Sequence, residues 1–166
     1  YKLLLEKNTL HKYTYFDNNT LLVLLDGTYY HSSEKIHCSH CQTRIKTDAK
    51  DVETTHYYHS AITPIIARPN TNTILPLLPE IISNEDGNDK QDCEINASKR
   101  WLEKSHLIAQ KYKLVLLGDD LYSKTSLIKK IREKEYNYIF VCKEPSHKKL
   151  YEVVHMVDKL GNMDTK

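Results

Sequence analysis

Residues 20–28 read TLLVLLDGT, a short and continuous apolar run that ends in Asp26 and Gly27. A run of this length that stops at a glycine favours a buried strand over a helix, which usually needs at least about 10 residues. Residues 113–120, KLVLLGDD, repeat the pattern and end in Asp119 and Asp120. Strands of this kind are buried on both faces by helices, so the two runs together predict an α/β fold.

The segments on either side of these runs predict the remaining order of elements. Before the second run the sequence is rich in β-branched and aromatic residues, and after residue 90 the apolar positions recur at helical spacing. We therefore expect a mixed sheet in which three antiparallel strands are followed by alternating helices and parallel strands. The expected elements are a hairpin with a long polar loop in 29–55, strands in 55–69 and 71–82, helices in 90–112, 121–135 and 147–160, and a strand in 137–143.

Length and composition predict one globular domain. The 166 residues carry 24 Lys and Arg against 22 Asp and Glu, a net charge of +2, which neither demands nor excludes a nucleic-acid partner. The longest apolar stretch, 21–25, is far shorter than the roughly 20 residues of a membrane span. With a mean hydropathy of −0.59, we expect a cytoplasmic protein without a membrane partner. Because the chain opens on Tyr1, we expect a fragment, with residues 1–19 as its uncertain start and 20–166 as the main domain.

The acids that end the two apolar runs are candidate metal ligands. If the two strands are neighbours, their carboxyl ends bring Asp26 and Asp119 or Asp120 to the same edge of the sheet. Carboxylate oxygens suit Mg²⁺ or Mn²⁺, and a pair of such ions activates a nucleophile and stabilises the leaving oxygen in phosphoryl transfer. The alternative is that these residues only form turns after strands.

A second candidate site lies in the polar loop of residues 31–55, where HCSHC spans residues 37–41. Cys38 and Cys41 supply half of a tetrahedral zinc site, and the spare ligands His37 and His40 lie beside them. Further candidate ligands are Cys93 and either His59 or His56. A redox-active thiol pair and two ordinary loop thiols are the alternatives.

Two acids, Asp92 and Glu94, flank Cys93 at the start of the long predicted helix. Acids are favoured near a helix N-terminus, where they interact with the helix dipole. The alternative is that one of them contacts a metal held by a neighbouring element.

Five segments of the chain resemble DDE transposases of insertion sequences, whose catalytic domain has an RNase H-like fold. In that family the first acid ends the first strand, which corresponds to Asp26. The second begins an Asp-x-x-Tyr motif, which corresponds to Asp119 with Tyr122, and Asp120 is the alternate. The matching segments are LLVLLDGTYYHSSEKIHCSHCQTR, THYYHSAITPIIARP, KQDCEINASKRWLEK, KLVLLGDDLYSKTSL and NYIFVCKEPSHKKLYE.

The resemblance implies Mg²⁺- or Mn²⁺-dependent cleavage and strand transfer of DNA, with transposon ends and target DNA as partners and a homo-oligomer at full length. The family's third acid is a Glu within a stretch that is missing here, since Glu133, Glu135, Glu144 and Glu152 lack its context. We therefore expect the N-terminal part of an RNase H-like domain, incomplete by itself. The alternatives are a nuclease of the same fold and a non-catalytic, zinc-containing module that binds DNA or protein.

Overall fold

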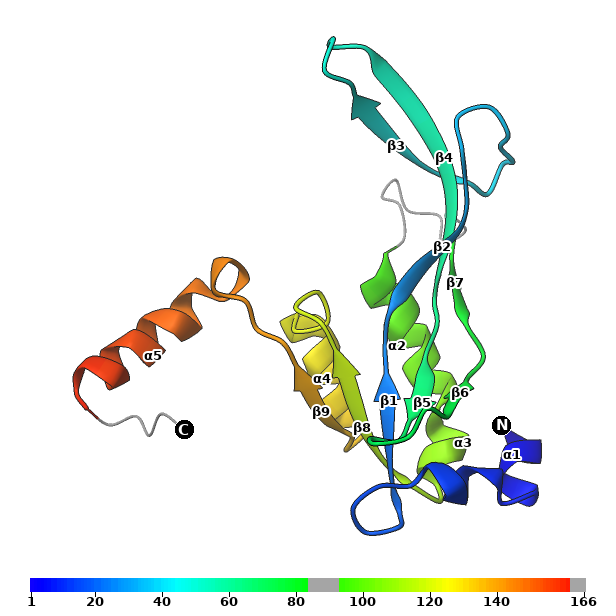
Figure 1. Ribbon diagram of the computed structural model, residues 1–166, viewed down its shortest axis with the longest axis vertical. Helices are drawn as coiled ribbons and strands as arrows, with labels where there is room; N and C mark the ends of the chain where they lie inside the picture. The colour runs from blue at the N-terminus through cyan, green and yellow to red at the C-terminus, as the bar shows by residue number, and fades with distance from the viewer. Residues whose placement is uncertain (84–92, 162–166) are drawn as a thin grey trace.

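The computed structural model describes residues 1–83 and 93–161, which form two β-sheets and five α-helices (Figure 1). The main sheet has the order β6-β5-β1-β8-β9. Antiparallel pairs join β1 to β5 and β5 to β6, whereas β8 and β9 run parallel to β1. The expected mixed α/β sheet is therefore confirmed. Its strands are β1 (Thr20–Leu24), β5 (Ile65–Ala67), β6 (Ile74–Pro76), β8 (Lys113–Gly118) and β9 (Asn137–Phe140).

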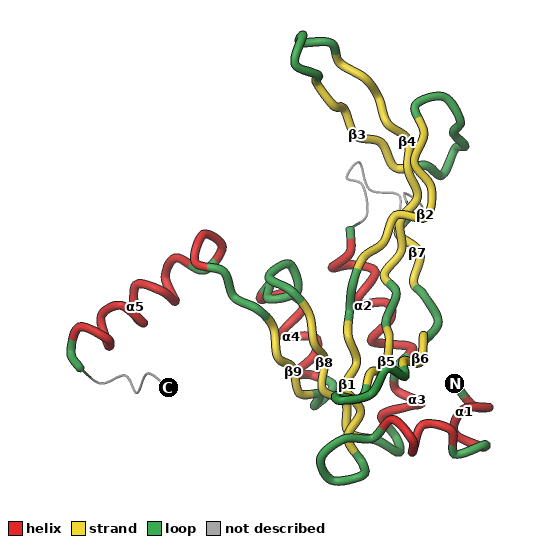
Figure 2. The backbone as a smooth tube through the Cα atoms, in the orientation of Figure 1, coloured by secondary structure: helices red, strands yellow, loops and turns green. Residues whose placement is uncertain are grey.

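The second sheet continues two strands of the first. β2 begins at Gly27, three residues after the end of β1, and β4 ends at Ile62, shortly before β5. The order is β2-β4-β3, with β7 paired to the end of β4. Figure 2 shows β2, β3 and β4 extending as a ribbon well beyond the main sheet. The bounds are β2 (Gly27–Ser33), β3 (Gln42–Thr47), β4 (Glu53–Ile62) and β7 (Glu80–Ile82).

The single strand expected over residues 55–69 is in fact two strands, β4 and β5, which are separated at Thr63 and Pro64. Pro64 has no N–H with which to continue a ladder. Its carbonyl accepts a hydrogen bond from Leu77 N at 2.9 Å, and Thr63 N donates to the carbonyl of Asp26 at 2.8 Å. The chain thus passes from the ribbon to the main sheet at the level of Asp26.

The helices follow the expected order with shorter bounds. The long helix expected over 90–112 is interrupted at Ser105, and its first three residues lie outside the described ones. In α2 the residues buried against the sheet are Ala97, Ser98, Trp101 and Leu102, one face of a helix. The helices are α1 (Lys2–Glu6), α2 (Glu94–Lys104), α3 (His106–Ala109), α4 (Thr125–Glu133) and α5 (Lys148–Lys159), with 3₁₀ turns η1 (Thr9–Tyr13) and η2 (Glu144–Ser146).

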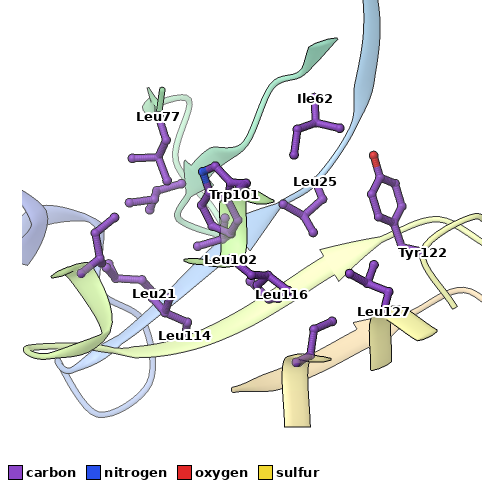
Figure 3. Close-up of a cluster of buried hydrophobic side chains, with 14 of the residues drawn as sticks. Leu21, Leu25, Ile62, Leu77, Trp101, Leu102, Leu114, Leu116, Tyr122 and Leu127 are labelled. Carbon is purple, nitrogen blue, oxygen red and sulfur yellow. The ribbon is translucent and has the colours of Figure 1, made fainter. Parts of the chain in front are cut away.

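The core lies between α2 and the main sheet. Trp101 and Leu102 of α2 are buried among Leu21 of β1 and Leu116 of β8, and Tyr122 lies at one end of this cluster (Figure 3). Burial of such side chains is the main stabilising contribution, about 1.5–3 kcal/mol each. In contrast, α5 stands away from the core in Figure 1 and has no buried residue. Among the described residues, no helix has the length and apolar character needed to cross a bilayer.

Candidate functional site

Asp26 and Asp119 occupy equivalent positions at the carboxyl edge of the main sheet. β1 and β8 are adjacent and parallel, and their last paired residues are Leu24 and Leu117. Each aspartate lies two residues beyond its member of this pair, and both are exposed. The ladder extends one step further, since Leu25 N donates to Leu117 O at 2.9 Å. The structure therefore brings the two predicted acids to the same edge of the same strand pair.

Glu94, the first residue of α2, faces this edge. Its carboxylate lies against Gly27, where an added Cβ would collide with the carboxylate atoms. Burial raises the pKa of Glu94, the hydrogen bond from Tyr122 lowers it, and the charges of Asp26 and Asp119 raise it. Glu94 thus responds electrostatically to both predicted metal ligands. Of the two acids beside Cys93, Glu94 thus lies at the edge that carries Asp26 and Asp119, while Asp92 lies outside the described residues.

Tyr122 joins the acids to the core. Its hydroxyl donates to Oε2 of Glu94 across 3.3 Å, and its ring is almost fully buried beside Gly118. Burial raises the pKa of Tyr122 above its ordinary value, and the charges of Glu94, Asp26 and Asp119 raise it further. The phenol therefore remains protonated and acts as a hydrogen-bond donor.

Asp120 has a different role from Asp119. Its Oδ1 accepts a hydrogen bond from the backbone N–H of Lys143 at 2.6 Å and lies 3.3 Å from Nε2 of His147. A hydrogen bond from Ser146 and the bond from the Lys143 N–H hold the pKa of Asp120 below its ordinary value. Asp120 thus links the β8–α4 connection to the segment before α5 by hydrogen bonds. Of the two neighbouring aspartates, Asp119 is therefore the one whose charge acts on Glu94.

Ser123 and His147 join Asp120 in a cluster that resembles a catalytic triad in composition only. Ser123 Oγ lies 2.6 Å from Nε2 of His147, and Asp120 contacts the same ring nitrogen. A serine nucleophile requires the histidine to bridge serine and acid through its two different nitrogens. The arrangement therefore gives no reason to assign a nucleophile to Ser123.

A second cluster, formed by Cys38, Cys41 and His59, could hold a metal ion. The two sulfurs are 3.8 Å apart, and Nε2 of His59 lies 3.4 Å from the Cys38 sulfur and 3.3 Å from the Cys41 sulfur. The backbone N–H of Cys38 donates to the Cys41 sulfur at 3.3 Å. A disulfide has an S–S distance of about 2.05 Å, so these are two thiols that converge on a histidine nitrogen.

The remaining predicted ligands lie elsewhere. Cys93 precedes α2 and lies outside the group of three converging ligand atoms, and His56 pairs with Glu34 at 3.3 Å. His37 stacks on Tyr57, with ring centroids 4.2 Å apart. Of the four predicted zinc ligands, the structure thus groups Cys38, Cys41 and His59 and leaves Cys93 apart.

The four glutamates considered for a third acid lie in or beside α4, η2 and α5. Glu133 ends α4, and Glu144 pairs with His155 at 3.3 Å. The acids whose charges reach Glu94 and Tyr122 are Asp26 and Asp119. The carboxylate that the fold adds to them is therefore Glu94, and its signal in the sequence was its place at the start of a helix.

Comparison of the chain with protein-family models, with curated proteins and with solved structures gave no match. The two sites themselves are therefore the observations from which a function can be inferred.

Proposed function

We propose that this chain is part of the catalytic domain of a DDE transposase with an RNase H-like sheet, a domain that cleaves DNA phosphodiesters at transposon ends and transfers the freed strand to target DNA. The observation that carries the proposal is the register of Asp26 and Asp119 at the ends of adjacent parallel strands. The strand order, three antiparallel strands followed by two parallel ones, supports the fold assignment. Glu94 adds a third carboxylate at the same edge.

The donor atoms at this edge suit a hard divalent cation. Asp26 and Asp119 offer exposed carboxylate oxygens, which are the ligands that Mg²⁺ and Mn²⁺ prefer. When bound, such an ion activates the attacking hydroxyl and stabilises the leaving oxygen in phosphoryl transfer. Asp26 and Asp119 would hold the ion, and Glu94, oriented by Tyr122, would add negative charge that favours its binding.

The reaction needs no reagent beyond DNA and water. Cleavage adds water across a P–O3′ bond and leaves a 5′-phosphate and a 3′-hydroxyl. Strand transfer then exchanges one phosphodiester for another, because the 3′-hydroxyl replaces the leaving 3′-oxygen of the target strand. A nuclease of the same fold would perform the first step alone, so formation of a joined product distinguishes the two.

The proposal is tested with Mn²⁺, whose free form gives a strong electron paramagnetic resonance signal that is lost on binding. We expect Asp26→Asn and Asp119→Asn each to weaken Mn²⁺ binding at least tenfold, and the matched control Asp120→Asn to change it less than threefold. In a protein that carries the complete catalytic domain, nicking of a supercoiled plasmid should follow the same ranking. Unchanged Mn²⁺ binding in both Asp26→Asn and Asp119→Asn would overturn the metal site, and nicking by the complete domain that survives both changes would overturn the role in cleavage.

For the second cluster we propose zinc in a structural role. In tetrahedral zinc sites, Zn–S bonds of about 2.3 Å and Zn–N bonds of about 2.0–2.1 Å place two sulfurs about 3.8 Å apart and a sulfur and a nitrogen about 3.6 Å apart. The distances among Cys38, Cys41 and His59 are 3.8, 3.4 and 3.3 Å. The cluster is thus preformed for zinc, and it supports equally the alternative of a zinc-containing binding module.

A further inference from the structure

Three ligands leave a tetrahedral zinc ion one position short, and a closed structural site takes four protein ligands. Resting on the zinc proposed above, we infer that His31 of β2 is the fourth ligand, so that the site is Cys₂His₂ and joins β2, the β2–β3 connection and β4.

Strand pairing places His31 in the same row as the cluster. β2 and β4 are antiparallel, and His31 pairs directly with His59. On the other side of β4, Gln42 begins β3 and pairs with Tyr58, and Cys41 immediately precedes it, with its sulfur 3.3 Å from Nε2 of His59. Residues that pair directly across strands project from the same face. The ring centroids of His31 and His59 are 5.7 Å apart.

A β-bulge determines that histidine, rather than tyrosine, occupies this position. Tyr29 pairs with Ser60, and the next pair is His31 with His59, so Tyr30 is the extra residue. Without the bulge, Tyr30 would oppose His59, and a phenol is a poor zinc ligand beside thiolates. Bulges commonly redirect a side chain at a functional position. Tyr30 instead stacks on the His59 ring, with centroids 5.6 Å apart and planes at 11°, which fixes the orientation of that ligand.

The hydrogen bond of His31 to a backbone carbonyl is of a kind that zinc-bound histidines make, and His37 makes one too. Its Nε2 lies 3.3 Å from the carbonyl oxygen of Ile36. A metal-bound histidine usually donates its second ring N–H to a carbonyl or carboxylate, which fixes the tautomer. With Nε2–H donated to Ile36, Nδ1 is the nitrogen that carries the lone pair for zinc. His31 lies outside the group of three mutually close ligand atoms, so binding requires its ring to move toward the cluster.

The two other histidines of the loop also lie outside the group of three converging ligand atoms. Nδ1 of His37 lies 3.3 Å from the carbonyl of Lys35, and its ring is stacked on Tyr57. Nδ1 of His40 lies 3.2 Å from the hydroxyl of Ser39. Both are close to the cysteines in sequence, which makes them matched controls for His31.

The test uses the whole chain, stripped of metal under reducing conditions and titrated with Co²⁺, then with Zn²⁺ in competition. Tetrahedral Co²⁺ gives intense visible bands, and each thiolate adds charge-transfer absorption. We expect one equivalent of Co²⁺ to bind with two thiolates. The change His31→Gln should lower zinc affinity at least tenfold, since even loss of an outer-shell partner costs 10–100-fold. The controls His37→Gln and His40→Gln should stay within twofold.

The outcomes separate the two proposals. If the unaltered chain binds no Co²⁺ tetrahedrally, the zinc proposal fails altogether. If the unaltered chain binds Co²⁺ tetrahedrally and the His31→Gln variant binds it equally well, the zinc proposal is supported and His31 is excluded as a ligand. A loss in His37→Gln or His40→Gln, with His31→Gln unaffected, likewise overturns the assignment. If His31→Gln folds poorly, His31→Cys provides the test. At a true ligand position the new thiolate would bind Co²⁺ and add a third thiolate charge-transfer band. Absence of this third band would reject His31 as a ligand.

Discussion

The phenol of Tyr122 donates a hydrogen bond to Oε2 of Glu94 across 3.3 Å, which joins the β8–α4 connection to the first residue of α2. This bond stabilises the ionised carboxylate of Glu94, whereas burial and the charges of Asp26 and Asp119 disfavour it. The pKa of Glu94 therefore reflects two opposing effects. The hydrogen bond from Tyr122 lowers it, and burial together with the charges of Asp26 and Asp119 raises it. A cation at the same edge would shift that balance toward the ionised form.

The change Tyr122→Phe should raise the pKa of Glu94 further, because it removes the interaction that lowers it. Mn²⁺ binding requires ionised carboxylates, so its pH midpoint should move to higher pH in the variant. The measurement is Mn²⁺ affinity between pH 5 and pH 8, and the matched control is Tyr112→Phe, a buried tyrosine whose hydroxyl lies 3.4 Å from Asn8. A midpoint that stays in place or moves to lower pH would show that Tyr122 does not stabilise the ionised Glu94.

A side chain at Gly27 should displace the Glu94 carboxylate. A Cβ at this position would meet the carboxylate atoms, so Gly27→Ala forces the Glu94 side chain to move. Because these atoms are the end of a flexible side chain, we expect a loss of about 0.5–1.5 kcal/mol in the free energy of unfolding. In a Glu94→Ala background the same change should cost much less, with a coupling energy of about 1 kcal/mol or more in urea denaturation. Simple additivity of the two changes would contradict the contact.

Most of the fold can be predicted from the two apolar runs of the sequence. Residues 20–28 and 113–120 are short, uninterrupted and ended by acids, and they form the adjacent central strands β1 and β8. The split of residues 55–69 into β4 and β5 was missed, because proline is tolerated at strand edges and Pro64 does not by itself mark a change of sheet. That change depends on the hydrogen bonds of Thr63 and Leu77, which are tertiary.

The candidate sites could also be predicted only in part, because some of their residues are brought together by tertiary packing. Asp26 and Asp119 follow directly from strand order, and Cys38 and Cys41 follow from their spacing. Glu94 is different, because an acid at a helix start is explained equally well by the helix dipole, and its nearness to Asp26 depends on how α2 packs. The pairing of His31 with His59 depends on a bulge, and register in a polar hairpin is weakly specified by sequence.

Metal removal should loosen the ribbon and leave the main sheet intact. The Cys38–Cys41–His59 cluster joins the β2–β3 connection to β4, while the core around Trp101 is separate from it. After chelation we expect amide hydrogen exchange in β3 and the adjoining half of β4 to accelerate at least tenfold, with β1 and β8 changed less than twofold. Added Zn²⁺ should restore protection and added Mg²⁺ should not. Equal acceleration in both sheets, or none in either, would contradict this local role.

Asp120→Asn should destabilise the junction before α5 in a pH-dependent way. In the folded protein a hydrogen bond from Ser146 and the N–H of Lys143 hold the pKa of Asp120 below its ordinary value. A carboxyl whose folded pKa is lowered contributes stability above its unfolded pKa and loses it as the pH falls through the folded pKa. The difference in unfolding free energy between the unaltered protein and Asp120→Asn should therefore be largest near pH 7 and shrink below about pH 4. Urea denaturation between pH 7 and pH 3 measures it, with the exposed Asp158 of α5, changed to Asn, as the control. A difference that grows on acidification would refute the role of the ionised carboxylate at this junction.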